Sequence, residues 1–454
     1  MSMLTVLDLF CGAGGLSLGF QAAGCRILAA VDVDETAAQT FSENFARLQP
    51  DAPPAVFTGD EGNIENLDIE RLTRGNPPDI LIGGPPCQGF SRLGRAKLDS
   101  LSDEGFAGDP RNTLYRRFLD AAEISKPRAV LMENVPGMLS VAGRNVANDV
   151  ADDLARRGYR VGYAVLNSVW YGVPQFRERL FFVGLRADLE VEPVMPPATH
   201  ATPLPQGYQQ PKAQLMLPLP LMQHHELPVE VKKAAIPAVT VADALDDLPL
   251  LTGHLSDESP LPRGDFRNSL AYRCAPHSRY AHLMRSWPGF PQTETVVDHS
   301  IRRTPRDYET FRRMNHGDRY PAALQIARER RDEELRRLGD TAPLADSAEY
   351  RELERRFIPP YPEDIFIDKW RKLIPDQPAW TVPAHLSKDA YSHIHHDSEQ
   401  ARAISIRDAA RLQSFPDAFL FSGNMGDCFR QVGNAVPPLV AWALATQLVA
   451  LLSL

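Results

Sequence analysis

The sequence predicts an α/β protein that is built on a doubly wound, Rossmann-like sheet and carries a second, irregular domain. Short apolar runs alternate with helix-like segments over the first 185 residues. A glycine-rich stretch follows the first of these runs, and a proline-rich region begins near residue 190. With 454 residues, the chain is long enough for two or three domains and a sizeable core.

Five apolar runs have the length and composition of buried strands. They are Leu4–Leu9, Arg26–Val31, Asp79–Ile82, Ala129–Met132 and Leu180–Val183. Segments with helical composition and spacing lie between them: Leu16–Ala23, Glu35–Phe45, Thr113–Ser125 and Val146–Arg157. Strands that alternate with helices predict a parallel sheet covered on both faces. Because ligands of such sheets bind beyond the carboxyl ends of the strands, we expect the chemistry in the residues directly after each strand.

The character of the sequence changes at about residue 190. Thirteen prolines from Pro193 to Pro262 exclude long helices and central strands there. A linker or a disordered insert is the alternative, but apolar stretches such as Leu215–Met222 favour an irregular second domain. Farther along, Arg302–Arg331 contains nine arginines and four acidic residues.

Three helices are expected in the last third of the chain. Arg328–Leu338 and Ser347–Phe357 are rich in both signs of charge, which is typical of solvent-facing helices with i,i+4 ion pairs. Leu439–Leu452 is an apolar helix close to the end of the sequence.

Composition excludes several classes of protein. Hydrophobic residues make up 43% of the chain and charged residues 24%, the balance of an ordinary globular protein. We find no apolar run near the roughly 20 residues of a membrane helix and no signal peptide, so we expect a cytoplasmic protein. The five cysteines include no CxxC pair, which argues against a disulfide framework and structural zinc. Because the formal net charge is −9, any nucleic-acid-binding surface has to be a local basic region.

The first motif with chemical content is Asp8–Gly15, directly after the first strand. Its glycines allow a tight turn and let a ligand approach the backbone closely. The pattern is not G-x-G-x-x-G, so a nicotinamide dinucleotide is not the expected ligand. Asp32 ends the second strand, where an acidic side chain can hold ribose hydroxyls. Together these residues indicate a nucleoside-bearing cofactor; a glycine-rich turn without a ligand is the alternative.

The second motif, Gly83–Ser91, contains a cysteine. Most lone cysteines are small buried hydrophobic residues, but two glycines and two prolines hold Cys87 at the carboxyl end of a strand. Because a thiolate is accessible near neutral pH and strongly nucleophilic, Cys87 is the candidate for covalent catalysis. The following segment, Arg92–Arg111, is expected to form a mobile lid.

Charged side chains stand at two further strand ends. Glu133 follows Ala129–Met132, and beside a nucleophile we interpret it as an acid bound to the substrate rather than as a helix cap. Arg177 and Arg179 lead into Leu180–Val183. Two arginines at i and i+2 of a strand project to the same face, which suits them to an anionic or carbonyl group.

Six motifs, in this order, resemble those of the cytosine-5 DNA methyltransferases of bacterial restriction–modification systems. They are Asp8–Gly15, Gly84–Ser91, Glu133–Val135, Gln175–Arg179, Arg411–Asp417 and Gln431–Pro437. The resemblance covers residues 4–185 and 369–454. The sequence departs from it at Gly59–Ile64, which carries two extra residues, so either Asp60 or Asn63 faces the adenine of the cofactor. Smaller departures at Arg407–Asp408 and Ile394–Asp397 lie outside the catalytic set.

The resemblance implies transfer of a methyl group from S-adenosylmethionine to carbon 5 of cytosine in a short duplex sequence. Cys87 is implied to attack carbon 6, and Glu133 to bind ring nitrogen 3 and the exocyclic amine. Arg179, with Arg177, is implied to bind the ring carbonyl. The target base has to leave the stack to be reached. The sequence does not identify the base that removes the carbon 5 proton, and water is one candidate.

The resemblance also implies which residues bind S-adenosylmethionine. They are Asp32 on the ribose, with Phe10, Gly12, Ala13, Gly14, Gly15, Asp60, Pro85, Leu114 and Asn434. No metal is expected, because the implied reaction does not use one and no cysteine lies near the histidine-rich tract. We interpret that tract as a DNA-contacting or structural loop; it comprises His385, His393, His395 and His396.

By the same resemblance, residues 1–190 and 424–454 form the catalytic and cofactor-binding domain, and residues 191–423 form the target-recognition domain that holds double-stranded DNA. We expect a monomer; a cognate restriction endonuclease, if present, acts on the same site without contact. A tRNA methyltransferase is an alternative that the long insert between Arg186 and Ile374 disfavours. A catalytically silent DNA-binding paralogue is another, which the presence of Cys87, Glu133 and Arg179 disfavours. The recognition sequence cannot be derived, because base readout depends on a few side chains.

Overall fold

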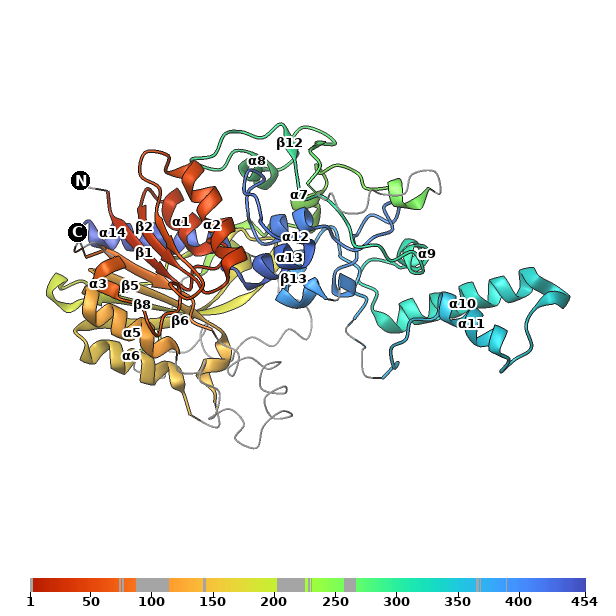
Figure 1. The fold of residues 1–454 in the computed structure, drawn as a ribbon, viewed down its shortest axis with the longest axis horizontal. Coiled ribbons are helices and arrows are strands. Elements are labelled where there is room, and N and C mark those ends of the chain that lie inside the picture. The colour runs from red at the N-terminus through yellow and green to blue at the C-terminus, as the bar shows by residue number, and fades with distance from the viewer. Residues whose placement is uncertain are drawn as a thin grey trace.

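A seven-stranded sheet forms the centre of the protein (Figure 1). The computed structural model describes residues 3–72, 75, 77–86, 114–141, 144–201, 225–227, 229, 231–256, 267–364, 367, 369–388 and 390–454. The strand order is β3-β2-β1-β4-β5-β8-β6. The strands span Thr5–Leu9 (β1), Arg26–Val31 (β2), Ala55–Phe57 (β3), Ile80–Gly83 (β4), Ala129–Asn134 (β5), Tyr159–Asn167 (β6) and Glu178–Arg186 (β8). The predicted α/β fold class is therefore confirmed.

The sheet is mixed rather than wholly parallel, so the prediction of a parallel sheet is wrong at one edge. β1 to β5 pair in parallel, whereas β8 runs antiparallel to both β5 and β6. The physical reason is the short connection between β6 and β8, which is residues 168–177. A short connection can join antiparallel neighbours, whereas a parallel pair needs a crossover of about a dozen residues or more.

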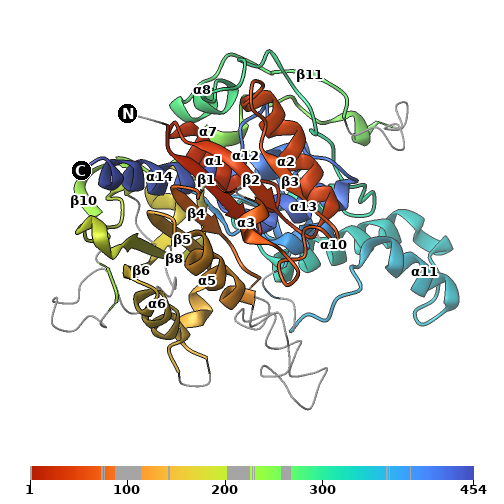
Figure 2. The same ribbon diagram turned by 60° about the vertical axis from the view of Figure 1, so that its left-hand side comes forward.

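Helices cover both faces of the sheet, as alternation of strands and helices predicts (Figure 2). Alternate strand residues face opposite layers: Val6 and Ile80 belong to one hydrophobic cluster, and Leu7 and Leu81 to the other. The first cluster includes α1 (Gly15–Ala22), α2 (Glu35–Leu48) and α14 (Pro438–Leu452). The second includes α3 (Ile69–Leu72), α5 (Leu114–Ser125) and α6 (Val146–Arg156). The predicted helices agree within a residue or two, except that α2 continues to Leu48; Thr113 lies outside the described residues.

The strand order reverses between β1 and β4, which are neighbours in the sheet although β2 and β3 separate them in the sequence. The carboxyl ends of these two strands, Leu9 and Gly83, pair with each other. Doubly wound sheets bind ligands at this type of switch point. The glycine-rich turn after β1 and the segment Gly84–Pro86 after β4 therefore leave the sheet side by side.

Outside the seven-stranded sheet and its covering helices, the described part of the chain contains many short elements. The strands form three small pairs: β7 (Gln175–Phe176) with β13 (Ala379–Trp380), β9 (Ala198–Ala201) with β10 (Val231–Pro237), and β11 (Leu270–Ala271) with β12 (Thr295–Val296). The helices are α7 (Val241–Leu245), α8 (Arg279–Arg285), α12 (Ile406–Leu412) and α13 (Met425–Asn434). Within the described part of Pro193–Pro262, no long helix and no central strand occurs, which agrees with its proline content; Leu215–Met222 lies outside the described residues.

Much of the chain after β8 packs directly on the sheet domain. The hydrophobic cluster that contains α1 and α14 also contains Leu245, Met284 and Phe415. Buried ion pairs fix these segments to one another: Arg411 of α12 contacts Asp417 at 2.6 Å and Asp247, just after α7, at 3.1 Å. The segments around α7, α8 and α12 are thus part of one continuous core with the sheet.

A smaller cluster lies apart from this core. It contains Phe311, Trp370 and Ile394 and supports α9 (Tyr308–Arg313) and a helical hairpin of α10 (Tyr320–Leu338) and α11 (Ala348–Phe357). The hairpin projects from the body of the protein in both ribbon views (Figures 1 and 2). α10 begins eight residues before its predicted start at Arg328, because its first turns bury an apolar face that the charge pattern does not reveal.

One apolar segment, Met425–Leu452, has the length and composition of a membrane span, but 56% of its most apolar part is buried inside the protein. Pro437 and Pro438 divide the segment into α13 and α14. α14 packs along α1, where a Cβ at Gly19 would collide with the backbone of Ala441 and Trp442. The segment therefore serves as a core element of the fold.

Candidate active site

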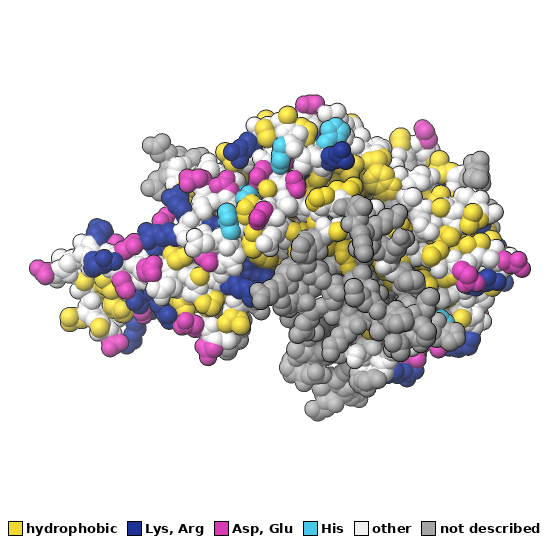
Figure 3. Space-filling model, turned by 180° about the vertical axis from the view of Figure 1, so that it is seen from behind, with side chains coloured by type: hydrophobic (Ala, Val, Ile, Leu, Met, Phe, Trp, Pro, Cys, Tyr) yellow, Lys and Arg dark blue, Asp and Glu magenta, His cyan; other side chains and the backbone are white. Residues whose placement is uncertain are grey.

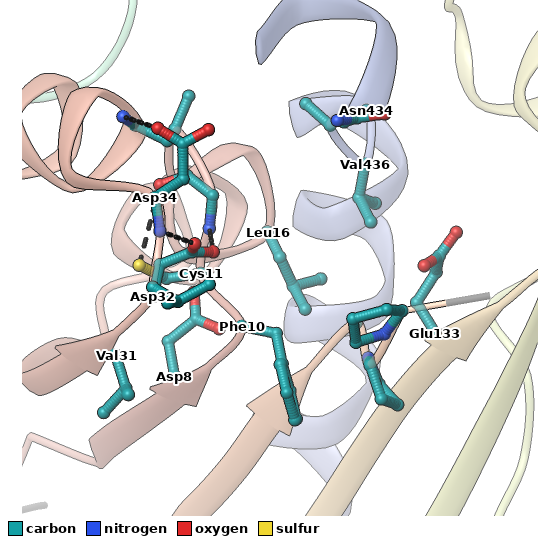
Figure 4. A pocket seen from close by; sticks show the side chains of 18 of the residues that line it. Asp8, Phe10, Cys11, Leu16, Val31, Asp32, Asp34, Glu133, Asn434 and Val436 are labelled. Carbon is teal, nitrogen blue, oxygen red and sulfur yellow. Dashed lines mark hydrogen bonds between the residues drawn. The ribbon is translucent and has the colours of Figure 1, made fainter. Parts of the chain in front are cut away.

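A cavity of about 580 Å³ lies at the carboxyl edge of the sheet, at the switch point between β1 and β4 (Figure 4). This volume is in the usual range for a small-molecule site. The predicted site residues that line it are Phe10, Gly12, Ala13, Gly15, Asp32, Pro85, Leu114, Glu133, Arg179 and Asn434. Gly14, Asp60 and Arg177 do not line it. Cys87 lies outside the described residues, but the residue before it, Pro86, lines the cavity.

The turn between β1 and α1 forms one wall. Gly12 has φ +53°, and a Cβ there would meet nothing within 4 Å, so it leaves open space beside the backbone. Gly14 has φ +96°, and a Cβ there would lie 2.7 Å from the ring of Phe41. A Cβ at Gly15 would collide with the carbonyl of Val436. Gly14 and Gly15 thus permit close packing of the turn. Gly14 does not line the cavity itself, but it allows the turn to take the shape of the cavity wall.

Asp32 is held in place where β2 ends. Its Oδ2 accepts a hydrogen bond of 2.7 Å from the backbone N–H of Gly12, and its Oδ1 accepts one of 2.8 Å from Asp34. Each carboxylate oxygen has a backbone donor, so the side chain is fixed between the two turns. Burial raises the pKa of Asp32 above its ordinary value, and these backbone hydrogen bonds oppose the shift.

A second acidic side chain, Asp8, lies near the carboxyl end of β1. It is buried, and its Oδ2 accepts a hydrogen bond of 2.6 Å from the hydroxyl of Ser17. Its Oδ1 has no hydrogen-bond partner among the described residues. Burial raises the pKa of Asp8 to about 8, and the nearby charge of Asp32 adds to the shift.

The segment after β3 contains Asp60 and Asn63, the two residues between which the sequence could not decide. Asn63 lines the cavity with Ile64, whereas Asp60 is exposed and does not line it. The two extra residues form a turn in which the N–H of Gly62 donates to Thr58, and the N–H of Asn63 to Asp60. This turn directs Asp60 outward, which is why the spacing alone could not identify the lining residue.

Glu133 and Arg179 form an ion pair within the same cavity. Arg179 Nε lies 2.8 Å from Glu133 Oε1, and the two side chains are 19% and 13% exposed. A Cβ at Gly84 would lie 3.2 Å from Glu133 Oε2, so the glycine keeps space beside the carboxyl group. Burial raises the pKa of Glu133, and the positive charges of Arg179 and Arg177 oppose this rise.

Arg177 has different surroundings from Arg179. Its side chain is 1% exposed and donates hydrogen bonds to the backbone carbonyls of Val382, Gly433 and Ala435, at 3.0, 2.8 and 3.1 Å. Unlike Arg179, Arg177 does not line the cavity, and it lies at the interruption between β7 and β8. Arg177 instead ties this junction to the end of α13.

Two lining residues on α13 were not predicted. Arg430 and Gln431 lie on the turn before Asn434. Arg430 contacts Asp34 at 3.0 Å and Asp427 at 3.1 Å. Gln431 accepts a hydrogen bond from Thr40. The sequence signal for Arg430 is its i,i+4 spacing from Asn434, which places both on one face of a helix.

Three residues of the histidine-rich tract, His393, His395 and His396, are buried, whereas His385 is exposed, and none of the four lines the cavity. His393 is fully buried, and burial lowers its pKa to about 3. His396 Nε2 lies 2.8 Å from Asp246 Oδ1. Among the described residues, no group of three or more His, Cys, Asp or Glu side chains is placed to hold a metal ion. These contacts support the structural interpretation of the tract.

The chain matches the family model described as C-5 cytosine-specific DNA methylase over residues 4–450. A protein of Oceanobacillus iheyensis whose name assigns it as a type II methyltransferase, M.OihORF3336P, is 38% identical over 97% of this chain and 94% of its own length. The type II methyltransferase M.AgeI of Thalassovita gelatinovora is 32% identical over 97% of this chain and 98% of its own length. A solved structure, described as a DNA modification methyltransferase encoded within an E. coli prophage, has the same fold, with a TM-score of 0.63 and 22% identity over 99% of this chain and all of the other.

Proposed function

The chain belongs to the C-5 cytosine-specific DNA methylase family, and on that premise we propose how its cavity serves the reaction. As a family member it is a DNA (cytosine-5-)-methyltransferase that depends on S-adenosylmethionine and acts on DNA. We propose that it is the modification enzyme of a type II restriction–modification system, as the names of its relatives indicate for them. The observation that carries the proposal is that one cavity contains both the predicted cofactor residues and the Glu133–Arg179 pair.

The chemistry of the cavity fits S-adenosylmethionine. This cofactor combines an adenosine with a methyl-bearing sulfonium, an ammonium and a carboxylate, and it supplies an electrophilic methyl group. Phe10, Ile64 and Leu114 offer apolar contact for the adenine, and Asn63 a polar one. Asp32, fixed by two backbone donors, suits the ribose hydroxyls. The unpartnered Oδ1 of Asp8 adds a buried polar atom on the same wall that can form a hydrogen bond with a ligand.

We assign three catalytic roles. Cys87, which follows the lining residue Pro86, adds to carbon 6 of cytosine, and this addition makes carbon 5 nucleophilic. Glu133 binds ring nitrogen 3 and the exocyclic amine, and its raised pKa favours the protonated form that can donate to that nitrogen. Arg179 holds Glu133 and offers donors to the ring carbonyl. Arg177 is a positioning residue, because its donors are directed to three backbone carbonyls.

We further propose that residues 191–423 contain the target-recognition region and that residues 1–190 and 424–454 provide the chemistry. The enzyme acts as a monomer in the cytoplasm on double-stranded DNA with the target base flipped out. A cognate endonuclease acts on the same site without direct contact. The family match and the full-length relatives favour DNA over tRNA as substrate.

A trapping experiment tests the proposed function. The purified protein is mixed with S-adenosylmethionine and duplex fragments from a random library, and the methylated cytosine is located by bisulfite sequencing. A duplex with 5-fluorocytosine at that position is then expected to form a covalent complex, because fluorine cannot leave as a proton does. Cys87→Ser is expected to abolish both methylation and trapping, and Cys274→Ser, at an exposed cysteine, to preserve both. Methylation by Cys87→Ser at the wild-type rate would contradict the assigned nucleophile.

A further inference from the structure

More acidic than basic side chains line the cavity. Five acidic residues line it: Asp8, Asp32, Asp34, Glu65 and Glu133. Two basic residues, Arg179 and Arg430, do so among the residues that the structure describes. The carboxylate of the methionine part of S-adenosylmethionine needs a cationic or N–H partner in a partly buried site.

Arg179 is already engaged. Its Nε contacts Glu133 and its Nη1 donates to the backbone carbonyl of Glu178. Arg179 also lies beside the carboxyl group assigned to the cytosine. Arg430 is therefore the basic side chain that remains for the cofactor carboxylate.

The guanidinium of Arg430 is held in place and is still open to a ligand. Both of its ion pairs, to Asp34 and to Asp427, use Nη2. Its Nη1 and Nε donate no hydrogen bond within the described part of the chain. The Asp34 carboxylate is itself fixed, because its Oδ1 accepts from the backbone N–H groups of Thr36 and Ala37 at the start of α2. The side chain is 42% exposed, as expected at the mouth of a cavity.

Asn434 supplies a second donor on the same helix face. It lies four residues after Arg430 on α13, lines the cavity and is exposed. Its side-chain amide forms no hydrogen bond with any described residue. Figure 4 shows Asn434 across the cavity from Asp32 and Asp34. An amide and a guanidinium with this spacing can donate to the two oxygens of one carboxylate.

We propose that Arg430, assisted by Asn434, binds the carboxylate of the methionine part of S-adenosylmethionine, and that Asp34 and Asp427 hold its guanidinium for this purpose. The inference rests on the proposed function and adds to it a residue that selects the zwitterionic cofactor over analogues without the carboxylate. Arg430 is thus a determinant of cofactor specificity that joins α13 to the turn after β2.

Calorimetric binding with two ligands tests this inference. S-adenosylmethionine and decarboxylated S-adenosylmethionine differ in the carboxylate alone, so each variant is titrated with both. The variants are Arg430→Gln, Arg430→Lys and the control Arg156→Gln; Arg156 is an exposed helical arginine that also pairs with an aspartate three residues before it. Circular dichroism melting establishes that each variant is folded.

We expect the wild type to prefer S-adenosylmethionine over the decarboxylated ligand by about tenfold or more. Arg430→Gln is expected to weaken binding of S-adenosylmethionine by a similar factor and to leave the decarboxylated ligand unaffected. Arg430→Lys should retain part of the preference, because it keeps the charge without the planar fork. Arg156→Gln should behave as the wild type.

Two results would overturn the inference. Equal weakening of both ligands by Arg430→Gln would show that the residue only joins α13 to the turn after β2. Unchanged binding of both ligands would place the carboxylate elsewhere, for example at the start of α1. A wild-type protein that binds neither ligand would contradict the proposed function itself, so the two failures are distinguishable.

Discussion

Asp8 shows how a single residue links the stability of this protein to pH. Its folded pKa is about 8 and its ordinary value is 3.8, because burial disfavours the charged form. The raised pKa stabilises the folded protein fully below pH 3.8, and this stabilisation is lost as the pH rises through about 8. Asp8→Asn cannot ionise, so its melting temperature relative to the wild type is expected to rise between pH 5 and pH 8.5.

Comparison with the wild type at each pH removes the contribution of groups that titrate in both proteins. The groups that face Asp8 are Ser17, Asp32 and Cys11. Ser17→Ala is a matched control, because it removes the hydrogen bond and leaves the carboxyl group able to titrate. Melting curves of Asp8→Asn and wild type that shift in parallel with pH would disprove the assigned pKa.

Glu133 is expected to affect turnover rather than cofactor binding. Glu133→Gln keeps an oxygen for Arg179 and removes the proton donor assigned to ring nitrogen 3. We expect the turnover rate to fall by ~10²-fold or more, the usual scale for a positioned acid or base. Calorimetry should show unchanged affinity for S-adenosylmethionine. If that affinity collapsed instead, Glu133 would be a structural residue of the cavity.

Residue-level prediction from sequence succeeded where a side chain follows directly from a strand end. Asp32 and Glu133 both line the cavity for this reason. Prediction failed where an inserted turn or a distant segment of the chain decides the orientation of a side chain. Asp60 points outward because of a turn specific to this segment, and Arg430 acquires its place through Asp34, almost 400 residues away in sequence.

At the scale of elements, hydrophobic runs predicted five strands and omitted the two edge strands of the sheet, β3 and β6. β6 contains Arg160, Gly162 and Tyr163 among its apolar residues, so it does not form a continuous apolar run. The antiparallel direction of β8 depends on its connection to β6, which the apolar pattern did not predict. Local sequence therefore identified the carboxyl edge of β1, β4 and β5, while the antiparallel edge required tertiary information.

Arg177 joins the junction between β7 and β8 to the end of α13. Its removal leaves three backbone carbonyls without their donor in a buried position. Arg177→Met is expected to lower the free energy of unfolding by about 3 kcal/mol, the scale for losing one member of a buried charged network. Arg26→Met, at an exposed arginine of β2, should change it little. Urea denaturation measures both.

Cofactor affinity separates this positioning role from a catalytic one. Because Arg177 holds Gly433 and Ala435 beside Asn434, Arg177→Met is also expected to weaken binding of S-adenosylmethionine. Arg177→Lys should restore part of both properties. Full cofactor affinity and stability combined with lost turnover would instead support a direct role for Arg177 at the cytosine.

At the scale of the whole molecule, the continuous core bears on where target recognition resides. Residues around α7, α8 and α12 pack into the same core as the sheet, although they fall within the proposed recognition region 191–423. The separate cluster around Phe311 and Trp370 carries the projecting hairpin. The basic stretch Arg302–Arg331 lies in this part, but a count of charges in the sequence does not reveal which arginines are paired with carboxylates.

Several arginines of that stretch are paired with carboxylates. Arg313 contacts Glu309 and Glu333, and Arg331 contacts Asp332 and Glu354. Figure 3 shows basic and acidic side chains interspersed over the hairpin on that face. The outer part of the hairpin, residues 331–356, contains six arginines and eight acidic residues. Phosphate binding needs an excess of positive charge, so this part of the hairpin is not expected to clamp DNA.

An excision tests this conclusion. The ends of residues 331–356 lie close together, because the Arg330 guanidinium lies 5.4 Å from the centre of the Phe357 ring. A linker of about eight Gly and Ser residues, which spans roughly 16 Å, can replace them. The shortened protein is expected to fold, to bind S-adenosylmethionine as the wild type does, and to bind duplex DNA with an unchanged dependence on salt. If the slope of log affinity against log salt fell by about one or more, the hairpin would contribute phosphate contacts, and its ion pairs would have to open on DNA.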